Sequence, residues 1–170
     1  MDEPRLAWVT KEAAAAAALP FDGWSTAIKT GAKVLAQFSA DKLWYRGYVE
    51  KVINPLSKTE QFDVYFIDYG NLERLPADRL RPMDAALMAV APQAQCAKLA
   101  YLTVPELDSE EFGYPAADAV DALVGGGQKL MCQTLTVQRV PGGHPRDAAG
   151  MAHVVLYAPG SEVEGDITQV

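Results

Sequence analysis

The chain has 170 residues and a mass of 18.4 kDa, which corresponds to one domain or two small ones. Apolar residues make up 49% and charged residues 22%, a balance that allows a buried core and excludes disorder over most of the length. Fifteen basic residues against 22 acidic ones give a net charge of −7, which argues against a protein that wraps duplex DNA by neutralising phosphates alone.

The first predicted element is a helix over residues 10–19. Thr10 can cap its N-terminus, and the run of alanines at 13–18 has the highest helix propensity of any residue type. Pro20 ends this helix. The following segment, residues 21–31, contains turn residues and mixed polarity, so it is interpreted as a connector.

Short strands follow, rich in Val, Ile, Tyr, Phe and Trp and separated by turn-type loops. The predicted strands are Val34–Phe38, Trp44–Ile53, Gln61–Asp68 and Leu72–Leu75, with a turn and a short last strand in Pro76–Pro82. Strict alternation in the third strand puts Phe62, Val64, Phe66 and Asp68 on one face and Tyr65, Ile67 and Tyr69 on the other. Because both faces are apolar, a small closed barrel is favoured over an open sheet with one wet face.

In the C-terminal half the closely spaced short strands give way to a strand, helix, strand, strand order, which predicts a mixed lobe. Its elements are a strand over Gln93–Val104, a helix over Pro115–Val124, and strands over Leu130–Val140 and Ala152–Tyr157. The fold class is therefore mainly β with some α. We expect an N-terminal helix and connector at 1–30, a barrel at 31–84, and a second lobe at 85–170 that is incomplete at its end.

Charge is unevenly distributed between these parts. Residues 31–84 carry 8 basic and 8 acidic groups, whereas residues 85–170 carry 4 and 10, a net −6. A neutral segment dense in aromatic residues beside an acidic one suggests a recognition surface for a cationic ligand, although charge alone favours simple solubility. A ring of aromatic faces binds a weakly hydrated cation such as methylated arginine or lysine. Aromatic residues at barrel strand ends also serve as core, and composition alone leaves both readings open.

Two motifs carry a family resemblance. Residues 44–52 read WYRGYVEKV and residues 64–71 read VYFIDYGN. Together they resemble the signature of Tudor domains, over roughly residues 31–84. The preceding helix and the later strand, helix, strand, strand order resemble the extended Tudor arrangement, in which an SH3-like five-stranded barrel is joined to a staphylococcal nuclease-like OB-fold lobe. Within that group the chain is most similar to the C-terminal region of the Tudor staphylococcal nuclease family.

The resemblance implies a binding module and not an enzyme. Its ligand would be symmetric dimethylarginine in Gly/Arg-rich tails of Sm-like or PIWI-like proteins, in RNA silencing or splicing ribonucleoproteins. The cage residues carried over are Phe38, Tyr45, Phe66, Tyr69 and Asn71. Asp68 is expected to tether the turn after it, and Trp44 is expected in the core. An acidic groove wall at Glu110 and Glu111 is expected to favour neighbouring unmodified arginines.

Two further functions remain open. A nuclease reading, also implied by the resemblance, would need a carboxylate-held metal and arginines. Near Arg139, Arg146 and Asp147 the sequence has no carboxylate cluster on a strand, and the acidic run at 106–111 fits a solvated face. RNA binding through the OB-like lobe, or through Lys33, Lys42, Arg46 and Lys51, is the other alternative.

Other features point away from cofactors and membranes. Cys96, Cys132, His144 and His153 lack metal-ligand spacing, so no metal site and no cofactor are expected. The two cysteines lie in apolar runs without a C-x-x-C pair, as expected for reduced intracellular thiols. No apolar stretch is long enough to span a bilayer. We therefore expect no membrane partner and a cytoplasmic or nuclear location.

Overall fold

The structure is a computed structural model, and it describes residues 3–24, 27–101, 118, 121–122, 130–139, 144 and 149–157. The chain divides into two compact units. The first comprises Met1–Cys96 with Arg139–Met151, and the second comprises Ala97–Gln138 with Ala152–Val170. The boundaries expected near residues 31 and 84 stay predictions.

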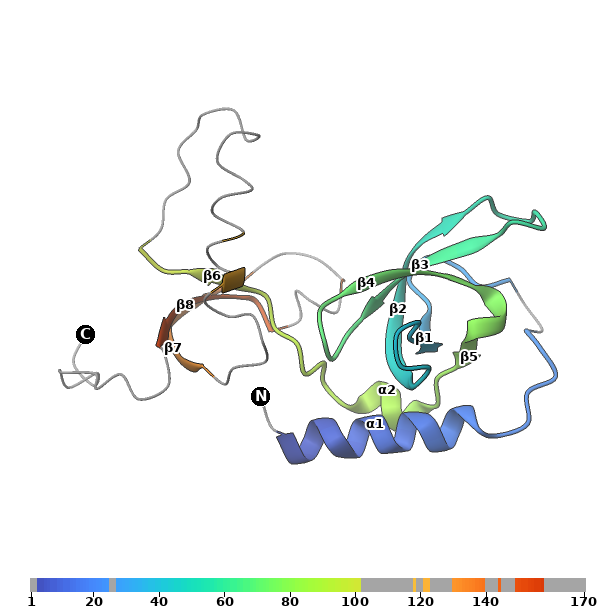
Figure 1. The fold of residues 1–170 in the computed structure, drawn as a ribbon, viewed down its shortest axis with the longest axis horizontal. Coiled ribbons are helices and arrows are strands. Elements are labelled where there is room, and N and C mark those ends of the chain that lie inside the picture. Colours follow the sequence, from blue (N-terminus) through green and yellow to red (C-terminus); the bar gives the residue numbers. More distant parts are fainter. Residues whose placement is uncertain are drawn as a thin grey trace. The chain divides into compact units, whose positions relative to one another are not determined.

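The first unit is built on an antiparallel sheet of five strands in the order β4-β3-β2-β1-β5 (Figure 1). The strands are β1 (Lys33–Gln37), β2 (Trp44–Ile53), β3 (Gln61–Phe66), β4 (Leu72–Pro76) and β5 (Leu80–Pro82). The edge strands β4 and β5 are joined only by a 3-10 turn, η1 (Ala77–Arg79), so the sheet curls around one core. Fully buried side chains from all five strands, among them Val34, Val49, Phe62, Leu75 and Leu80, fill it. The predicted mainly β architecture with five antiparallel strands is confirmed.

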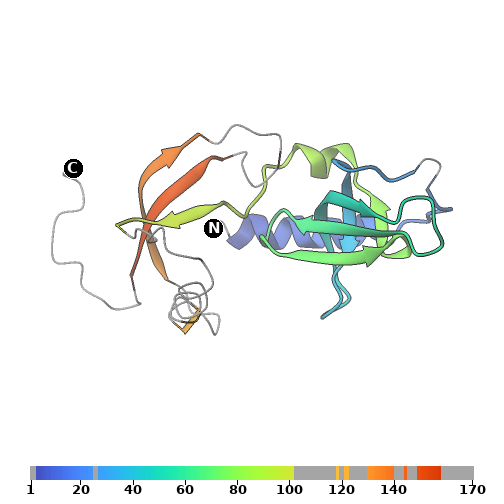
Figure 2. The same cartoon turned by 90° about the horizontal axis from the view of Figure 1, so that it is seen from above.

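Helix α1 (Glu3–Ala17) begins seven residues before the predicted start, so the expected capping role of Thr10 is wrong. Pro4 lies in the first turn, where its missing N–H costs no intrahelical hydrogen bond. Val9 and Ala13, four residues apart on one face, are buried at 1% and 0% exposure. Figures 1 and 2 show α1 alongside the sheet of the first unit, next to the short helix α2.

Helix α2 (Ala85–Ala89) was not predicted. Asp84 caps it by accepting a hydrogen bond from the backbone N–H of Leu87 at 2.7 Å. Leu87 joins Ala13 and Leu35 in a second buried cluster. One amphipathic turn of five residues is too short to leave a helical period in the sequence, which is why the pattern did not reveal it.

A buried ion pair connects β2 to the segment that follows α2. All five N–H donors of Arg46 have acceptors: its Nε and one Nη2 hydrogen donate to the Asp68 carboxylate at 2.8 and 2.5 Å. The remaining three donate to the carbonyl oxygens of Leu87, Val90 and Ala91 at 2.6–3.0 Å. The Arg46 and Asp68 side chains are 0% and 2% exposed. Such a fully satisfied bidentate pair holds the chain after β3 and the chain after α2 against the same strand.

The second unit contains a three-stranded sheet in the order β6-β8-β7. Its strands are β6 (Ala97–Leu99), β7 (Met131–Gln138) and β8 (Met151–Tyr157), and β6 runs parallel to β8. Strands β7 and β8 fall where they were predicted, whereas β6 is much shorter than the strand expected over Gln93–Val104. Of the helix expected over Pro115–Val124, residues 118, 121 and 122 are described and helical, and the rest lies outside the described residues. Within the described ranges, no helix has the length and apolar character needed to cross a bilayer.

Candidate functional site

The turn after β3 brings two predicted cage residues to the same side. The backbone N–H groups of Tyr69 and Gly70 both donate to the carbonyl of Phe66, and the N–H of Phe66 donates to the carbonyl of Asn71. Gly70 has φ +87°, a left-handed conformation that favours glycine. The expected strand through Asp68 put the side chains of Phe66 and Tyr69 on opposite faces of the sheet. That expectation is wrong, because β3 ends at Phe66 and Tyr69 lies in the turn after it.

The hairpin between β1 and β2 supplies the other two rings. Tyr45 lies opposite Ala36 in the register, and Phe38 follows the end of β1. The loop closes through the Phe38 N–H donating to the Leu43 carbonyl at 2.9 Å and the Lys42 N–H donating to the Phe38 carbonyl at 3.0 Å. Phe38 and Tyr45 therefore stand at the same end of the sheet.

These residues surround one cavity with a volume of about 340 Å³. It is lined by Phe38, Asp41, Tyr45, Phe66, Tyr69 and Asn71. All five residues carried over from the family signature thus meet at one place, with Asp41 as an addition. Whether they bind a ligand stays a prediction at this point.

The rings meet edge to face. Phe38 lies 5.5 Å from Phe66 and 6.5 Å from Tyr45, measured between ring centroids, with interplanar angles of 83° and 77°. Tyr45 lies 6.1 Å from Phe66 and 5.0 Å from Tyr69, at 89° and 76°. Rings at nearly right angles form the walls of a box and turn different faces toward its interior, which suits a cation that needs several π-faces at once.

Burial divides the box into a floor and a rim. Phe66 is 1% exposed and belongs to the main core, whereas Tyr69 is 47% exposed. Phe38 and Tyr45 are partly buried and pack against that core. The two readings of the aromatic cluster, core and cage, are therefore not exclusive, because the same rings that close the core also line the cavity.

The one ionisable carboxylate among the lining residues is Asp41, which sequence reasoning missed. Its carboxylate accepts a hydrogen bond from the Tyr45 hydroxyl at 2.7 Å and another from the backbone N–H of Leu43 at 2.9 Å. The Tyr45 hydrogen bond, followed by that of Leu43, holds the pKa of Asp41 below its usual value. Burial, and then the hydrogen bond to Asp41, raises the pKa of Tyr45, so this phenol stays protonated and neutral. The local signal was Asp41 two residues before Leu43, the spacing of an Asx turn.

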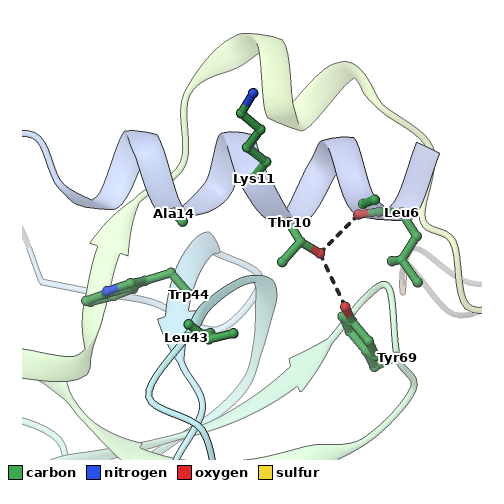
Figure 3. A pocket seen from close by; sticks show the side chains of 8 residues that line it. Leu6, Thr10, Lys11, Ala14, Leu43, Trp44 and Tyr69 are labelled. Carbon is green, nitrogen blue, oxygen red and sulfur yellow. Dashed lines mark hydrogen bonds between the residues drawn. The ribbon is translucent and has the colours of Figure 1, made fainter. Parts of the chain in front are cut away.

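Tyr69 is held from the opposite side by α1 (Figure 3). The Thr10 hydroxyl lies 3.0 Å from the Leu6 carbonyl oxygen and 3.2 Å from the Tyr69 hydroxyl. Because the carbonyl can only accept, the single Thr10 proton goes to Leu6, and Tyr69 donates to Thr10. The ring that forms the exposed wall of the cavity is thereby oriented by a helix outside the sheet.

Three other sequence expectations change. Asp68 does not tether its turn through the turn N–H groups: its carboxylate binds Arg46 and accepts from the Gln93 N–H at 3.0 Å. Arg46 is buried, so it does not belong to an RNA-binding surface. Trp44 packs against the second buried cluster, near the core where it was expected, but it is only partly buried, and the Arg81 guanidinium carbon lies 5.2 Å from the centroid of its ring.

The residues considered for catalysis, and the acidic run, lie in the C-terminal part of the chain. Arg139 is exposed, whereas Arg146, Asp147 and the acidic run at 106–111, including Glu110 and Glu111, lie outside the described residues. Among the residues that are described, no group of three or more His, Cys, Asp or Glu side chains could hold a metal ion. The expectation of a chain without catalysis stays a prediction.

Comparisons with known sequences agree with the motif reading. The Tudor domain family model matches residues 15–101. Ribonuclease TUDOR 1 of Arabidopsis thaliana is 35% identical over 117 residues, which is 68% of this chain and 12% of that protein. Staphylococcal nuclease domain-containing protein 1 of Drosophila melanogaster is 39% identical over 83 residues, 49% of this chain and 8% of that protein. The chain thus spans about a tenth of the length of these relatives.

Solved structures of extended Tudor domains share the fold. That of Drosophila melanogaster Papi, in complex with a Piwi N-terminal peptide, has a TM-score of 0.73 at 22% identity and covers 97% of this chain and 82% of the other. That of human TDRD1, in complex with a symmetrically dimethylated peptide, has a TM-score of 0.72 at 21% identity and covers 93% and 71%. At such identities the likeness shows the fold alone.

Proposed function

Because the chain belongs to the Tudor domain family, we propose that it is a non-catalytic module that binds symmetric dimethylarginine in protein tails. The observation that carries this proposal is the 340 Å³ cavity walled by four aromatic rings at nearly right angles. The peptides bound by the human TDRD1 and Papi domains support it. Partners of the Sm-like or PIWI-like kind follow from the same proposal.

Each lining group has a distinct part in this proposal. The faces of Phe38, Tyr45 and Tyr69 attract the methylated guanidinium, which keeps its charge but has fewer N–H donors than arginine. The Asp41 carboxylate adds a negative charge at the cavity. The Asn71 side chain offers an amide oxygen as acceptor for a remaining guanidinium N–H. Phe66, without a hydroxyl, contributes an apolar floor.

The direct test is calorimetric titration with one Gly-Arg peptide in unmodified, asymmetric dimethyl and symmetric dimethyl forms. We expect the symmetric form to bind most tightly, because methylation on both nitrogens leaves each with one N–H and places apolar groups against two ring faces. Equal affinity for all three forms would show that the rings serve as core only.

The charge of Asp41 can be isolated with Asp41→Asn, which removes the negative charge, keeps an amide oxygen as acceptor for the Leu43 N–H, and offers an amide N–H that the Tyr45 hydroxyl oxygen can accept. We expect about threefold to fivefold weaker binding of every cationic peptide, because the charge pair is exposed to solvent and partly screened. Asp78→Asn, which removes an exposed charge away from the cavity, is the matched control and should change little.

The pH dependence of this effect follows from the lowered pKa of Asp41. Because its pKa is lowered, the Asp41 carboxylate is fully charged at any pH well above the ordinary pKa of an aspartate. It becomes neutral only when the pH falls through its own, lower pKa. The affinity ratio between the original protein and Asp41→Asn should therefore be the same at pH 7.5 and pH 5.0. A ratio that falls toward one at pH 5.0 would show that Asp41 is neutral there and would contradict its lowered pKa.

We also infer that the second unit is part of a nuclease-like OB lobe. The β6-β8-β7 sheet and the extended Tudor structures that cover more than nine-tenths of this chain support this assignment. The names of the curated relatives keep RNA binding as the second candidate function. Lys33, Lys42 and Lys51 are exposed on the first unit. Binding that weakens steeply as salt rises would favour RNA, because each neutralised phosphate releases counterions.

A further inference from the structure

A second cavity, drawn in Figure 3, shares the Tyr69 side chain with the aromatic one. Its volume is about 530 Å³. Its lining comes from α1 and from the end of the β1–β2 loop, and consists of Leu6, Ala7, Thr10, Lys11, Ala14, Leu43, Trp44 and Tyr69. We call it the α1 groove.

The α1 groove is chemically different from the cage. Its walls are mostly aliphatic or aromatic carbon, and Leu43 is 50% exposed there. The hydroxyl groups of Thr10 and Tyr69 already bond to each other, and Thr10 donates to Leu6. Lys11 is the only charged residue in the lining. With little unmet hydrogen-bonding capacity, this groove suits an apolar side chain.

The groove and the cage share structural elements. Tyr69 is a wall of both. The loop before β2 also serves both: Asp41 and Tyr45 line the cage, whereas Leu43 and Trp44 line the groove. Because the two cavities share a wall and a loop, one bound peptide can place side chains in both.

We propose that the α1 groove takes an aliphatic side chain of the same peptide whose methylarginine occupies the cage, a proposal that rests on the proposed function. An extended peptide advances about 3.3–3.6 Å per residue, so a residue close to the arginine in sequence can reach a cavity that shares a wall with the cage. Tails made only of glycine and arginine leave the groove empty. The ligand is thus defined by two features, a methylated arginine and a neighbouring aliphatic residue.

The test compares peptides that carry one symmetric dimethylarginine, flanked either by glycines alone or by a single leucine scanned through four positions on each side. We expect one leucine position to tighten binding about fivefold, since burying part of a leucine side chain is favourable. The protein variants are Ala14→Gln and Ala15→Gln. Both alanines are exposed on α1, but only Ala14 lines the groove. The substitution is neutral and favourable for a helix, so it does not change the attraction for a cation.

Ala14→Gln should lose the gain from leucine and keep the affinity for the glycine-flanked peptide, whereas Ala15→Gln should keep both. If leucine improves binding nowhere, or if Ala14→Gln retains the gain, the inference is wrong although the cage proposal stands. If the glycine-flanked peptide fails to bind at all, the cage proposal fails first. Sedimentation of the unliganded protein adds a separate check: a dimer that dissociates in Ala14→Gln would assign the groove to a second copy and overturn the peptide assignment.

Discussion

Arg46→Met is expected to lower the free energy of unfolding by about 3–5 kcal/mol, because it leaves the Asp68 carboxylate buried without its counter-charge. It also removes the donors to three backbone carbonyls, those of Leu87, Val90 and Ala91. Chemical denaturation, with the midpoint and slope fitted together, measures this loss. Adding Asp68→Leu should restore part of the stability, since the buried charge disappears while the carbonyls stay unsatisfied.

The first unit supplies a matched control for this prediction. Arg74 and Asp63 form another bidentate pair, at 2.7 and 3.1 Å, but their side chains are 53% and 15% exposed. Arg74→Met should therefore lower the free energy of unfolding far less than Arg46→Met does, because an exposed ion pair contributes little to stability. Equal losses in Arg46→Met and Arg74→Met would contradict the assignment of a structural role to the buried pair.

Tyr45→Ala is expected to weaken binding of the symmetrically dimethylated peptide by roughly fivefold to thirtyfold. The substitution removes one wall of the cage and the hydroxyl that donates to Asp41. A desolvated cation–π contact contributes about 1–2 kcal/mol, which corresponds to that range of affinity. Tyr45 is preferable to Tyr69 for this test because it does not line the α1 groove. Calorimetric titration measures the loss.

Two comparisons give this result its meaning. Tyr101→Ala, the same substitution at a tyrosine that is 88% exposed and outside the cavity, should leave binding unchanged. Tyr45→Phe keeps the ring face and should retain most of the affinity. An unchanged affinity in Tyr45→Ala, with the thermal unfolding curve preserved, would exclude the cage from ligand recognition.

The five-stranded sheet of the first unit was predictable because its signal is local. Alternating aromatic and β-branched residues, cut by turn residues, define β2 residue by residue, and the two motifs located the rings of Tyr45 and Phe66. Such patterns record burial and strand period directly. The resemblance, and not the periodicity, assigned all five cage residues, Phe38, Tyr45, Phe66, Tyr69 and Asn71.

The parts that escaped prediction depend on contacts between segments distant in sequence. The partners of Arg46 lie 22 to 45 residues away, so its burial leaves no local trace. The true start of α1 was hidden because Thr10 looked like a cap, whereas its hydroxyl bonds the preceding turn. In the sequence Asp41 is an ordinary loop residue, because its hydrogen bond from the Tyr45 hydroxyl forms only when the hairpin folds.

Tyr45 and Arg46 are neighbours on β2, and adjacent side chains of a strand point to opposite faces. Asp68 and Tyr69 are also adjacent, in the turn after β3, with Asp68 in the buried pair and Tyr69 in the cage wall. In both segments, a residue that lines the cavity (Tyr45, Tyr69) is thus next to a residue of the buried ion pair (Arg46, Asp68). Substitutions at Tyr45 and Tyr69 can therefore alter ligand recognition while the neighbouring Arg46–Asp68 pair keeps the framework in place.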